Sequence, residues 1–347
     1  MTSIQRNNNT NYKYVFVCGL QRSGTSVLAR NIGRLENCTT FKNTGVLHDE
    51  GQYLQDVYPS DHKLGGAGRY GFNPRAHLTE GSELLTPENV ARLRSSWHSH
   101  WDKDKSICLE KTPGNLIMTR FLQAAFPNAY FIVIWRHPVA VSMATQKWSL
   151  SSLKTLFEHW LRCHDLFEQD RQYLSHVYEL TYEDYVENPA KHHNQIADFI
   201  GTRVVSNQME YLSSAYNRKY LNRWSNLLTN SPWKPYYLYI ASKYEPKFAR
   251  YNYFLTKGLD ANSKQCGSDT ESMAARVGVL YCLGADVIFF FWRLHDRKME
   301  LVTKPIRSIL PRALKDRIKH ALQRRQLHWA ARLVAPRWFA GIQKNVS

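Results

Sequence analysis

Residues Tyr14–Leu28 read YVFVCGLQRSGTSVL, and this stretch decides the fold. An apolar run from Tyr14 to Cys18 stops at Gly19, a short segment rich in glycine and hydroxyl groups follows, and a helix-like run then begins. The order of strand, tight turn and helix N-terminus is typical of a phosphate-binding loop. Backbone N–H groups at the start of a helix have no intrahelical partner, so they are available to an anion.

The cations of this loop differ from those of a nucleoside triphosphatase. The spacing fits G-x-x-x-x-G-[KT]-[ST], but a triphosphatase would have lysine where Thr25 stands, and here the cation comes earlier, as Arg22. We therefore predict that Arg22 binds a phosphate or sulfate ester. Ser23, Gly24, Thr25 and Ser26 are expected to cradle the same ester through backbone N–H groups and hydroxyls.

A second motif lies at Tyr130–Ser142, which reads YFIVIWRHPVAVS. The apolar run predicts a strand buried on both faces of a parallel sheet, and it ends in Arg136. A magnesium-dependent triphosphatase usually has an aspartate near this position, whereas arginine meets an anion directly. His137-Pro138 breaks the strand, and the following helix is expected to present Ser142 to the same anion.

Together and in this order, the two motifs resemble those of the sulfotransferases that use 3′-phosphoadenosine 5′-phosphosulfate (PAPS). The resemblance implies that the first loop holds the 5′-phosphosulfate and that Arg136 and Ser142 hold the 3′-phosphate. It also implies an enzyme that moves a sulfuryl group from PAPS, by in-line transfer and without a metal.

Arg22 is the first candidate catalytic cation, and Lys111 is the second. It lies in ICLEKTPGNL, where a short strand runs into Glu110-Lys111-Thr112-Pro113. This turn resembles one of glycan sulfotransferases, in which the lysine faces the transferring sulfuryl group. The alternative is a lysine that only pairs with Glu110 in a surface turn.

The catalytic base has two candidates. Glu50-Gly51-Gln52-Tyr53-Leu54 resembles the E-x-Q-[FY]-[FL] segment of heparan-type sulfotransferases, whose glutamate is the base. A carboxylate suits a sugar hydroxyl, because nearby cations and partial burial set its pKa. His48 competes, since the aryl and steroid branch of the superfamily uses a histidine, and neither residue being the base is the third possibility.

Two later segments also resemble parts of this family. Thr181–Gly201 resembles a helix entry, in which Tyr182 and Glu183 are expected to be structural. Tyr216–Trp224 (YNRKYLNRW) resembles a basic loop that closes over the adenosine, which makes Lys219 and Tyr220 candidate cofactor contacts. A basic amphipathic helix is the alternative for that segment.

Strand and helix patterns alternate along the chain, which predicts an α/β fold of the phosphate-loop type: three layers, with a central parallel sheet flanked by helices. Gly19, Glu110-Lys111 and Arg136 follow predicted strands, so all are expected at one edge of the sheet, where such folds bind ligands. The predicted strands are Tyr14–Cys18, Ile107–Leu109, Tyr130–Trp135 and Val177–Thr181. The predicted helices are Ser26–Leu35, Pro87–Trp97, Leu116–Ala125, Val139–Lys147, Leu153–Tyr173 and Pro189–Ile200.

Three regions are predicted: a disordered tail at 1–12, a sulfotransferase domain at 13–257 and a basic helical C-terminal extension at 258–347. The 347 residues carry a net charge of +17. Residues 293–347 contain 14 Lys/Arg and three acidic residues, or +11, which leaves +6 for the rest. A helix on an anionic membrane surface and a helix docked on the enzyme are both compatible with this extension.

The acceptor is expected to be a hydroxyl or amine of a carbohydrate or glycolipid, and no nucleic acid is expected as a partner. Scattered cysteines and a polar N-terminus favour a cytoplasmic enzyme, peripheral at the inner membrane if the extension binds lipid. A phosphate-loop kinase is the first rival, and a non-enzymatic basic scaffold for membrane or nucleic acid is the second.

Overall fold

The computed structural model describes residues 12–149, 151–205 and 208–256. Five parallel strands form one sheet in the order β2-β3-β1-β4-β5. This confirms the predicted α/β class. The predicted tail up to residue 11 and the predicted C-terminal extension lie outside the described residues.

The strands are β1 (Lys13–Cys18), β2 (Cys38–Thr40), β3 (Ile107–Lys111), β4 (Ala129–Trp135) and β5 (Val177–Thr181). The helices are α1 (Thr25–Ile32), α2 (Pro87–His98), α3 (Thr119–Ala125), α4 (Pro138–Gln146), α5 (Leu153–Arg171), α6 (Tyr182–Glu187), α7 (Pro189–Ile200), α8 (Ala215–Thr229) and α9 (Lys234–Ala249).

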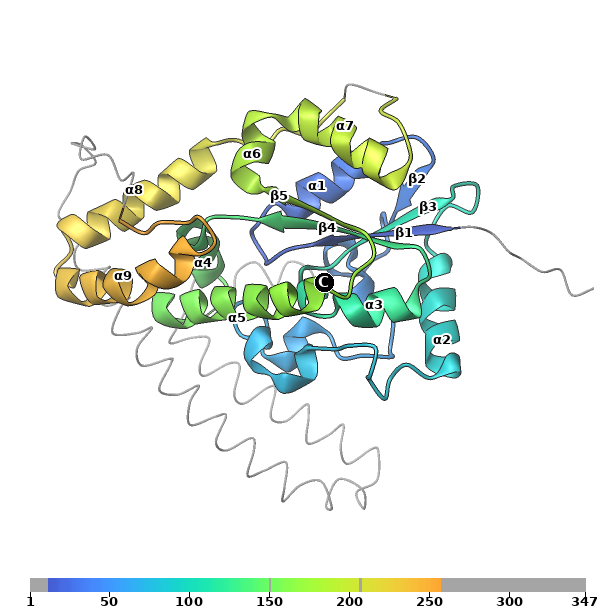
Figure 1. Cartoon of the computed structure of the whole chain (residues 1–347), viewed down its shortest axis with the longest axis horizontal. Helices are drawn as coiled ribbons and strands as arrows, with labels where there is room; N and C mark the ends of the chain where they lie inside the picture. Colours follow the sequence, from blue (N-terminus) through green and yellow to red (C-terminus); the bar gives the residue numbers. More distant parts are fainter. Residues whose placement is uncertain (1–11, 150, 206–207, 257–347) are drawn as a thin grey trace, which may run out of the picture. The chain divides into compact units, whose positions relative to one another are not determined.

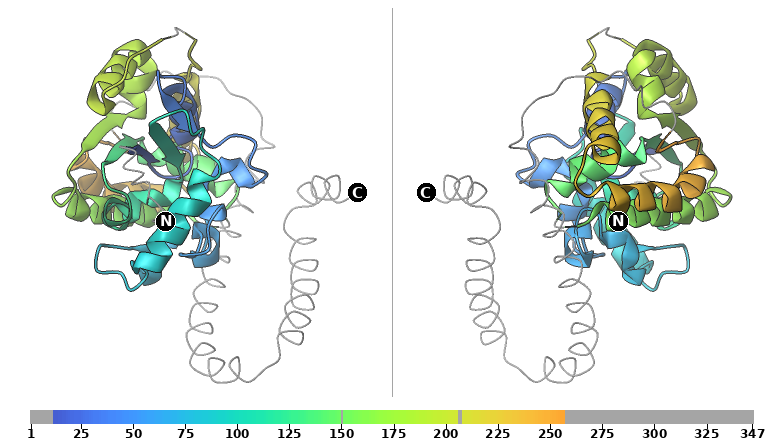
Figure 2. Two further views of the ribbon diagram at one scale, coloured as in Figure 1. Left: turned by 90° about the vertical axis from the view of Figure 1, so that its right-hand side faces the viewer. Right: turned by 90° about the vertical axis from the view of Figure 1, so that its left-hand side faces the viewer.

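Helices cover both faces of the sheet, with α1, α6 and α7 on one side and α3 and α5 on the other (Figure 1). The alternation of side chains along a strand explains why both faces are apolar. In β1, Val15 and Val17 pack with α1 and α7, while Tyr14 and Phe16 pack with the helices of the opposite layer. The short 3-10 segments between β2 and α2 lie on the α5 side, as the turned views in Figure 2 also show.

The predicted convergence at one edge of the sheet is confirmed. Val17 of β1 is paired with Lys111 of β3, and Cys18 with Val133 of β4. Because all the strands are parallel, the segments that leave β1, β3 and β4 emerge on the same side. The loop after Gly19, the Lys111 turn and Arg136 are therefore neighbours in space.

Candidate functional site

The loop between β1 and α1 has the conformation expected of an anion cradle. Gly24 immediately precedes α1 with φ of 98°, and a Cβ there would lie 3.1 Å from a ring carbon of Tyr182. Only glycine tolerates this backbone together with so close a neighbour. Ser23 is fully buried, and its Oγ has no hydrogen-bond partner among the described residues.

A cavity of about 240 Å³ lies at this loop. Of the predicted cofactor-binding residues, it brings together Arg22, Gly24, Thr25, Ser26, Arg136 and Tyr220. The two arginines, which are 114 positions apart, therefore open onto one space. The other lining residues are Val27, Ala144, Tyr182, Leu212 and Tyr216.

Arg136 is the buried cation of this cavity. Its side chain donates from Nε to Asn217 Oδ1 at 2.8 Å and from Nη1 to the Arg22 carbonyl at 2.5 Å, and its guanidinium lies 3.9 Å from the centre of the Tyr182 ring. Within the part of the chain that the structure describes, Nη2 has no partner. Burial lowers the pKa of Arg136. A desolvated cation with an unused donor is a site for an anion.

Arg22 is exposed, and its side chain is held by a contact of a different kind from those of Arg136. Its φ is 74°, and its guanidinium lies 4.6 Å from the centre of the Trp148 ring. This cation–π contact orients a side chain that has a long, flexible stem. The cavity thus contains one fixed, buried arginine and one exposed arginine that is free to approach a ligand.

Two predicted cofactor contacts lie elsewhere. Ser142 does not line this cavity but a smaller one of about 10 Å³, with Gln21 and His159. Two residues along a helix correspond to about 200° of rotation, so Ala144 faces the arginines and Ser142 faces away. Lys219 is exposed and is not among the lining residues, whereas its neighbour Tyr220 is.

The segment that contains Lys219 is a helix rather than a loop, since α8 spans Ala215–Thr229. Tyr182 is also more than structural, because its ring forms a wall of the cavity. Asn217 was missed altogether, although it connects Arg136 to Glu183 through a 2.5 Å hydrogen bond from Nδ2. No local pattern marks Asn217, because its partners are far away in the sequence.

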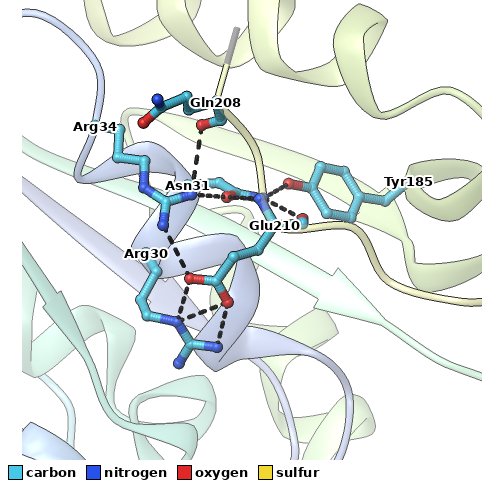
Figure 3. A network of polar contacts seen from close by, with 6 residues as sticks. All are labelled: Arg30, Asn31, Arg34, Tyr185, Gln208 and Glu210. Atoms are coloured by element: carbon cyan, nitrogen blue, oxygen red, sulfur yellow. Dashed lines mark hydrogen bonds and ion pairs between the residues drawn. The ribbon is translucent and has the colours of Figure 1, made fainter. Parts of the chain in front are cut away.

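The segment after residue 207 is fastened to the helix of the anion loop (Figure 3). Glu210 accepts hydrogen bonds from Arg30 Nη2 at 2.7 Å and Arg34 Nη2 at 3.1 Å. Its backbone N–H donates to Asn31 Oδ1 at 2.9 Å. These contacts anchor the chain two residues before Leu212, whose methyl carbon Cδ1 would lie 3.2 Å from a Cβ at Gly24.

A second cluster contains the candidate base. Glu50 and Lys111 are both buried, and Lys111 Nζ lies 2.8 Å from Glu50 Oε1. Gln52 donates from Nε2 to Glu50 Oε2 at 2.6 Å. Lys111 therefore pairs with Glu50 and not with Glu110. His48 is exposed, with φ of 56°, and within the described residues it makes no hydrogen bond or ion pair with this cluster.

Glu110 holds this cluster in place through hydrogen bonds to the neighbouring residues. Its Oε1 accepts from the Gly51 N–H at 2.8 Å and from Thr112 Oγ1 at 2.5 Å, and its Oε2 accepts from Asn115 Nδ2. A Cβ at Gly51 would lie 2.8 Å from the Glu110 carboxylate, so glycine allows this close approach. Burial raises the pKa of Glu110 to about 7. Glu110 thus fixes the loop that carries Glu50 beside Lys111.

Two features are absent from the described ranges. No group of three or more His, Cys, Asp or Glu side chains there could hold a metal ion. None of the helices in those ranges is both long enough and apolar enough to cross a membrane.

The comparison with protein families matches residues 15–206 to the model described as the sulfotransferase family. The matched range is more than half of the 347 residues. No curated protein matches the chain.

Solved structures that are similar to parts of the chain include sulfotransferase STF9 from Mycobacterium avium, at 13% identity over 70% of this chain and 76% of that one, with a TM-score of 0.41. The sulfotransferase domain from the curacin biosynthetic pathway has 13% identity over 67% of this chain and 97% of that one, with a TM-score of 0.38. Mouse sulfotransferase SULT7A1 complexed with PAP has 15% identity over 64% and 68%, with a TM-score of 0.30. On the family match, the chain belongs to the sulfotransferase family.

Proposed function

We propose that the protein transfers the sulfuryl group of PAPS to a hydroxyl or amine of a carbohydrate or glycolipid. One observation carries the donor assignment: Arg136, buried and with an unused Nη2, lines the same cavity as Arg22 and the start of α1. A donor with phosphate groups on the 3′ and 5′ oxygens of one ribose needs two anion sites within reach of each other. The family membership supports sulfuryl transfer as the reaction.

Different residues are suited to bind the 5′-phosphosulfate and the 3′-phosphate of this donor. The N–H groups at the start of α1 and the hydroxyls of Thr25 and Ser26 suit the 5′-phosphosulfate. Arg136 suits the 3′-phosphate, because its guanidinium is already positioned by Asn217 and the Arg22 carbonyl. When bound, PAPS supplies an activated sulfuryl group on an acidic bisphosphate leaving group.

Glu50 is the proposed base. It takes the proton of the acceptor hydroxyl or amine as the acceptor atom bonds to sulfur and the bond between sulfur and the 5′-phosphate oxygen breaks. Lys111, 2.8 Å from Glu50, holds the carboxylate in place and provides a positive charge where negative charge develops. The exposed position of His48 favours Glu50 over it.

A cavity of about 680 Å³ supports the proposed acceptor class. Gln52, the residue that hydrogen-bonds Glu50, is one of its lining residues. Its wall mixes aromatic side chains such as Tyr53 and Tyr58 with polar ones such as Gln55 and Ser60. Such a surface suits a sugar, whose ring has apolar faces and hydroxyl edges.

Titration calorimetry with 3′,5′-bisphosphoadenosine and with ATP tests the donor assignment. We expect tighter binding of the bisphosphate. Tighter binding of ATP would favour a kinase, and absence of binding for both would favour a scaffold. Transfer of radiolabelled sulfate from PAPS to sugar, lipid, peptide and phenol acceptors then tests the acceptor class, which is wrong if only phenols or peptides are sulfated.

A further inference from the structure

Asp61 makes contact with both halves of the site. It begins a short 3-10 segment, Asp61–Leu64, in the connection between β2 and α2. Gln21, in the loop after β1, donates from Nε2 to Asp61 Oδ2 at 2.6 Å. The backbone N–H of Asp61 donates to Gln52 Oε1 at 2.8 Å. Gln52 then donates to Glu50, so a chain of three hydrogen bonds joins the donor loop to the proposed base.

The donor and acceptor groups fix the direction of these hydrogen bonds. A backbone N–H can only donate, so the Gln52 amide must turn its oxygen toward Asp61 and its nitrogen toward Glu50. Glu50 accepts one hydrogen bond from Lys111 Nζ through Oε1 and one from Gln52 Nε2 through Oε2. The amide of Gln52 therefore has one orientation that satisfies both neighbours, and the backbone N–H of Asp61 determines it.

The surroundings of Asp61 disfavour the charged form of its carboxyl group. Burial and the nearby charge of Glu50 raise its pKa, and Lys111 is engaged by Glu50. The carboxylate is hydrogen-bonded by the Gln21 amide, and the Tyr53 hydroxyl lies 3.5 Å from Oδ1. Hydrogen bonds from the His62 backbone and the Gln52 side chain also act to lower its pKa. Two acidic side chains are thus held near each other by neutral amides.

We propose that Asp61 is a positioning residue that sets the distance and orientation of Glu50 relative to the donor loop, through Gln21 on one side and Gln52 on the other. This inference rests on the proposed role of Glu50 as the base. It assigns to Asp61 no contact with the donor or acceptor.

The test compares Asp61→Ala, Asp61→Asn, Glu50→Gln and the double variant Glu50→Gln/Asp61→Ala in a PAPS-dependent sulfation assay with the full chain. Asp61→Ala keeps the backbone N–H that orients Gln52 but removes the carboxylate that fixes this segment to Gln21. The segment should then shift, and kcat should fall roughly 10- to 100-fold, because a misplaced group costs about that much. The dissociation constant for 3′,5′-bisphosphoadenosine should stay within about threefold, since the cradle and Arg136 remain. Asp61→Asn keeps an acceptor for Gln21 and should recover most of kcat.

The double variant should be no slower than Glu50→Gln, because residues that act through one another are not additive. Asp198→Ala, which removes an exposed carboxylate on α7, is the matched control and should behave as wild type. Thermal melting of each variant separates a loss of kcat from a loss of folded protein.

Full kcat in Asp61→Ala would overturn the inference, as would a further multiplicative loss in the double variant. Weaker bisphosphate binding at unchanged kcat would assign Asp61 to the donor loop alone, and a lower melting temperature that asparagine does not restore would make it structural. These results leave the proposed function intact if Glu50→Gln is inactive. Absence of sulfation by wild type, or full activity of Glu50→Gln, is a failure of the proposed function instead.

Discussion

Glu50 and Lys111 form a buried ion pair, in which Nζ lies 2.8 Å from Oε1 and the side chains are 9% and 8% exposed. A pair of this kind is desolvated, so removing one partner leaves a buried charged group without its counter-ion. Lys111 is the last residue of β3, and Glu50 is held against β3 by the contact between Gly51 and Glu110. The base and the cation therefore form one unit on the rigid edge of the sheet.

Glu50→Gln should abolish proton transfer while leaving donor binding intact. The amide has nearly the same size but accepts no proton, so kcat should fall about 10²- to 10⁴-fold. Steady-state kinetics and titration with 3′,5′-bisphosphoadenosine measure the two effects separately. His48→Ala is the informative companion, because full activity in Glu50→Gln together with a loss in His48→Ala would transfer the base role to the histidine.

Arg136→Ala should weaken the donor site selectively. Removing charge-assisted hydrogen bonds of this kind costs about 1.5–3 kcal/mol, so the dissociation constant for 3′,5′-bisphosphoadenosine should rise roughly 10- to 100-fold. Binding of 5′-AMP should change less, since it lacks the 3′-phosphate. Calorimetry with both ligands measures the difference. Arg162→Ala, an exposed arginine on α5, is the control, and an unchanged preference in Arg136→Ala would refute the assignment.

The sequence predicted best what depends on local pattern. The strand from Val177 to Thr181 and the helix from Pro189 to Ile200 have the predicted bounds, because β-branched residues and a proline at the helix start mark them. β2 was missed, since three residues carry too little periodicity. Helix α3 begins at Thr119 and not at Leu116, because the Pro113–Ile117 turn is a 3-10 helix.

The sequence predicted those residues of the candidate site that lie in loops directly after strands. It did not predict contacts between side chains that are far apart in the sequence. Ser142 lines a different cavity from Arg136, because each residue of a helix turns the side-chain direction by 100° and the sequence motif does not take this rotation into account. Asn217 lies 81 positions from Arg136, and only the packing of α8 against α4 brings them together. A basic segment in the sequence does not reveal which of its residues faces a ligand.

Glu110 should make stability depend on pH. Its pKa is about 7 in the folded protein, because burial disfavours the charged form, against an ordinary value of 4.5. Between these values the folded protein binds more protons than the unfolded chain, so stability falls as the pH rises from about 4.5 to 7. The contribution lost is on the order of 3 kcal/mol at most.

Urea unfolding at pH 5 and pH 8 measures this effect. Glu110→Gln has no proton to lose, so the difference between the two pH values should be smaller than in wild type. The amide keeps an oxygen for the Gly51 N–H, and Asn115 can reverse its own amide, because its Oδ1 has no partner among the described residues. Equal pH dependence in both proteins would show that Glu110 does not titrate in this window.

Glu210→Gln should loosen the donor cavity without unfolding the protein. Its ion pairs with Arg30 and Arg34 are partly exposed, and such pairs contribute little to stability. They nevertheless hold the chain that places Leu212 against Gly24, so affinity for 3′,5′-bisphosphoadenosine should fall by about two- to fivefold. The loss should shrink at high salt, because screening already weakens the pairs in wild type.

Glu36→Gln removes a similar exposed pair, with Arg203, away from the lining residues of the cavity and should leave affinity unchanged. Equal effects of the two variants in calorimetry would mean that Glu210 contributes only to the general surface charge.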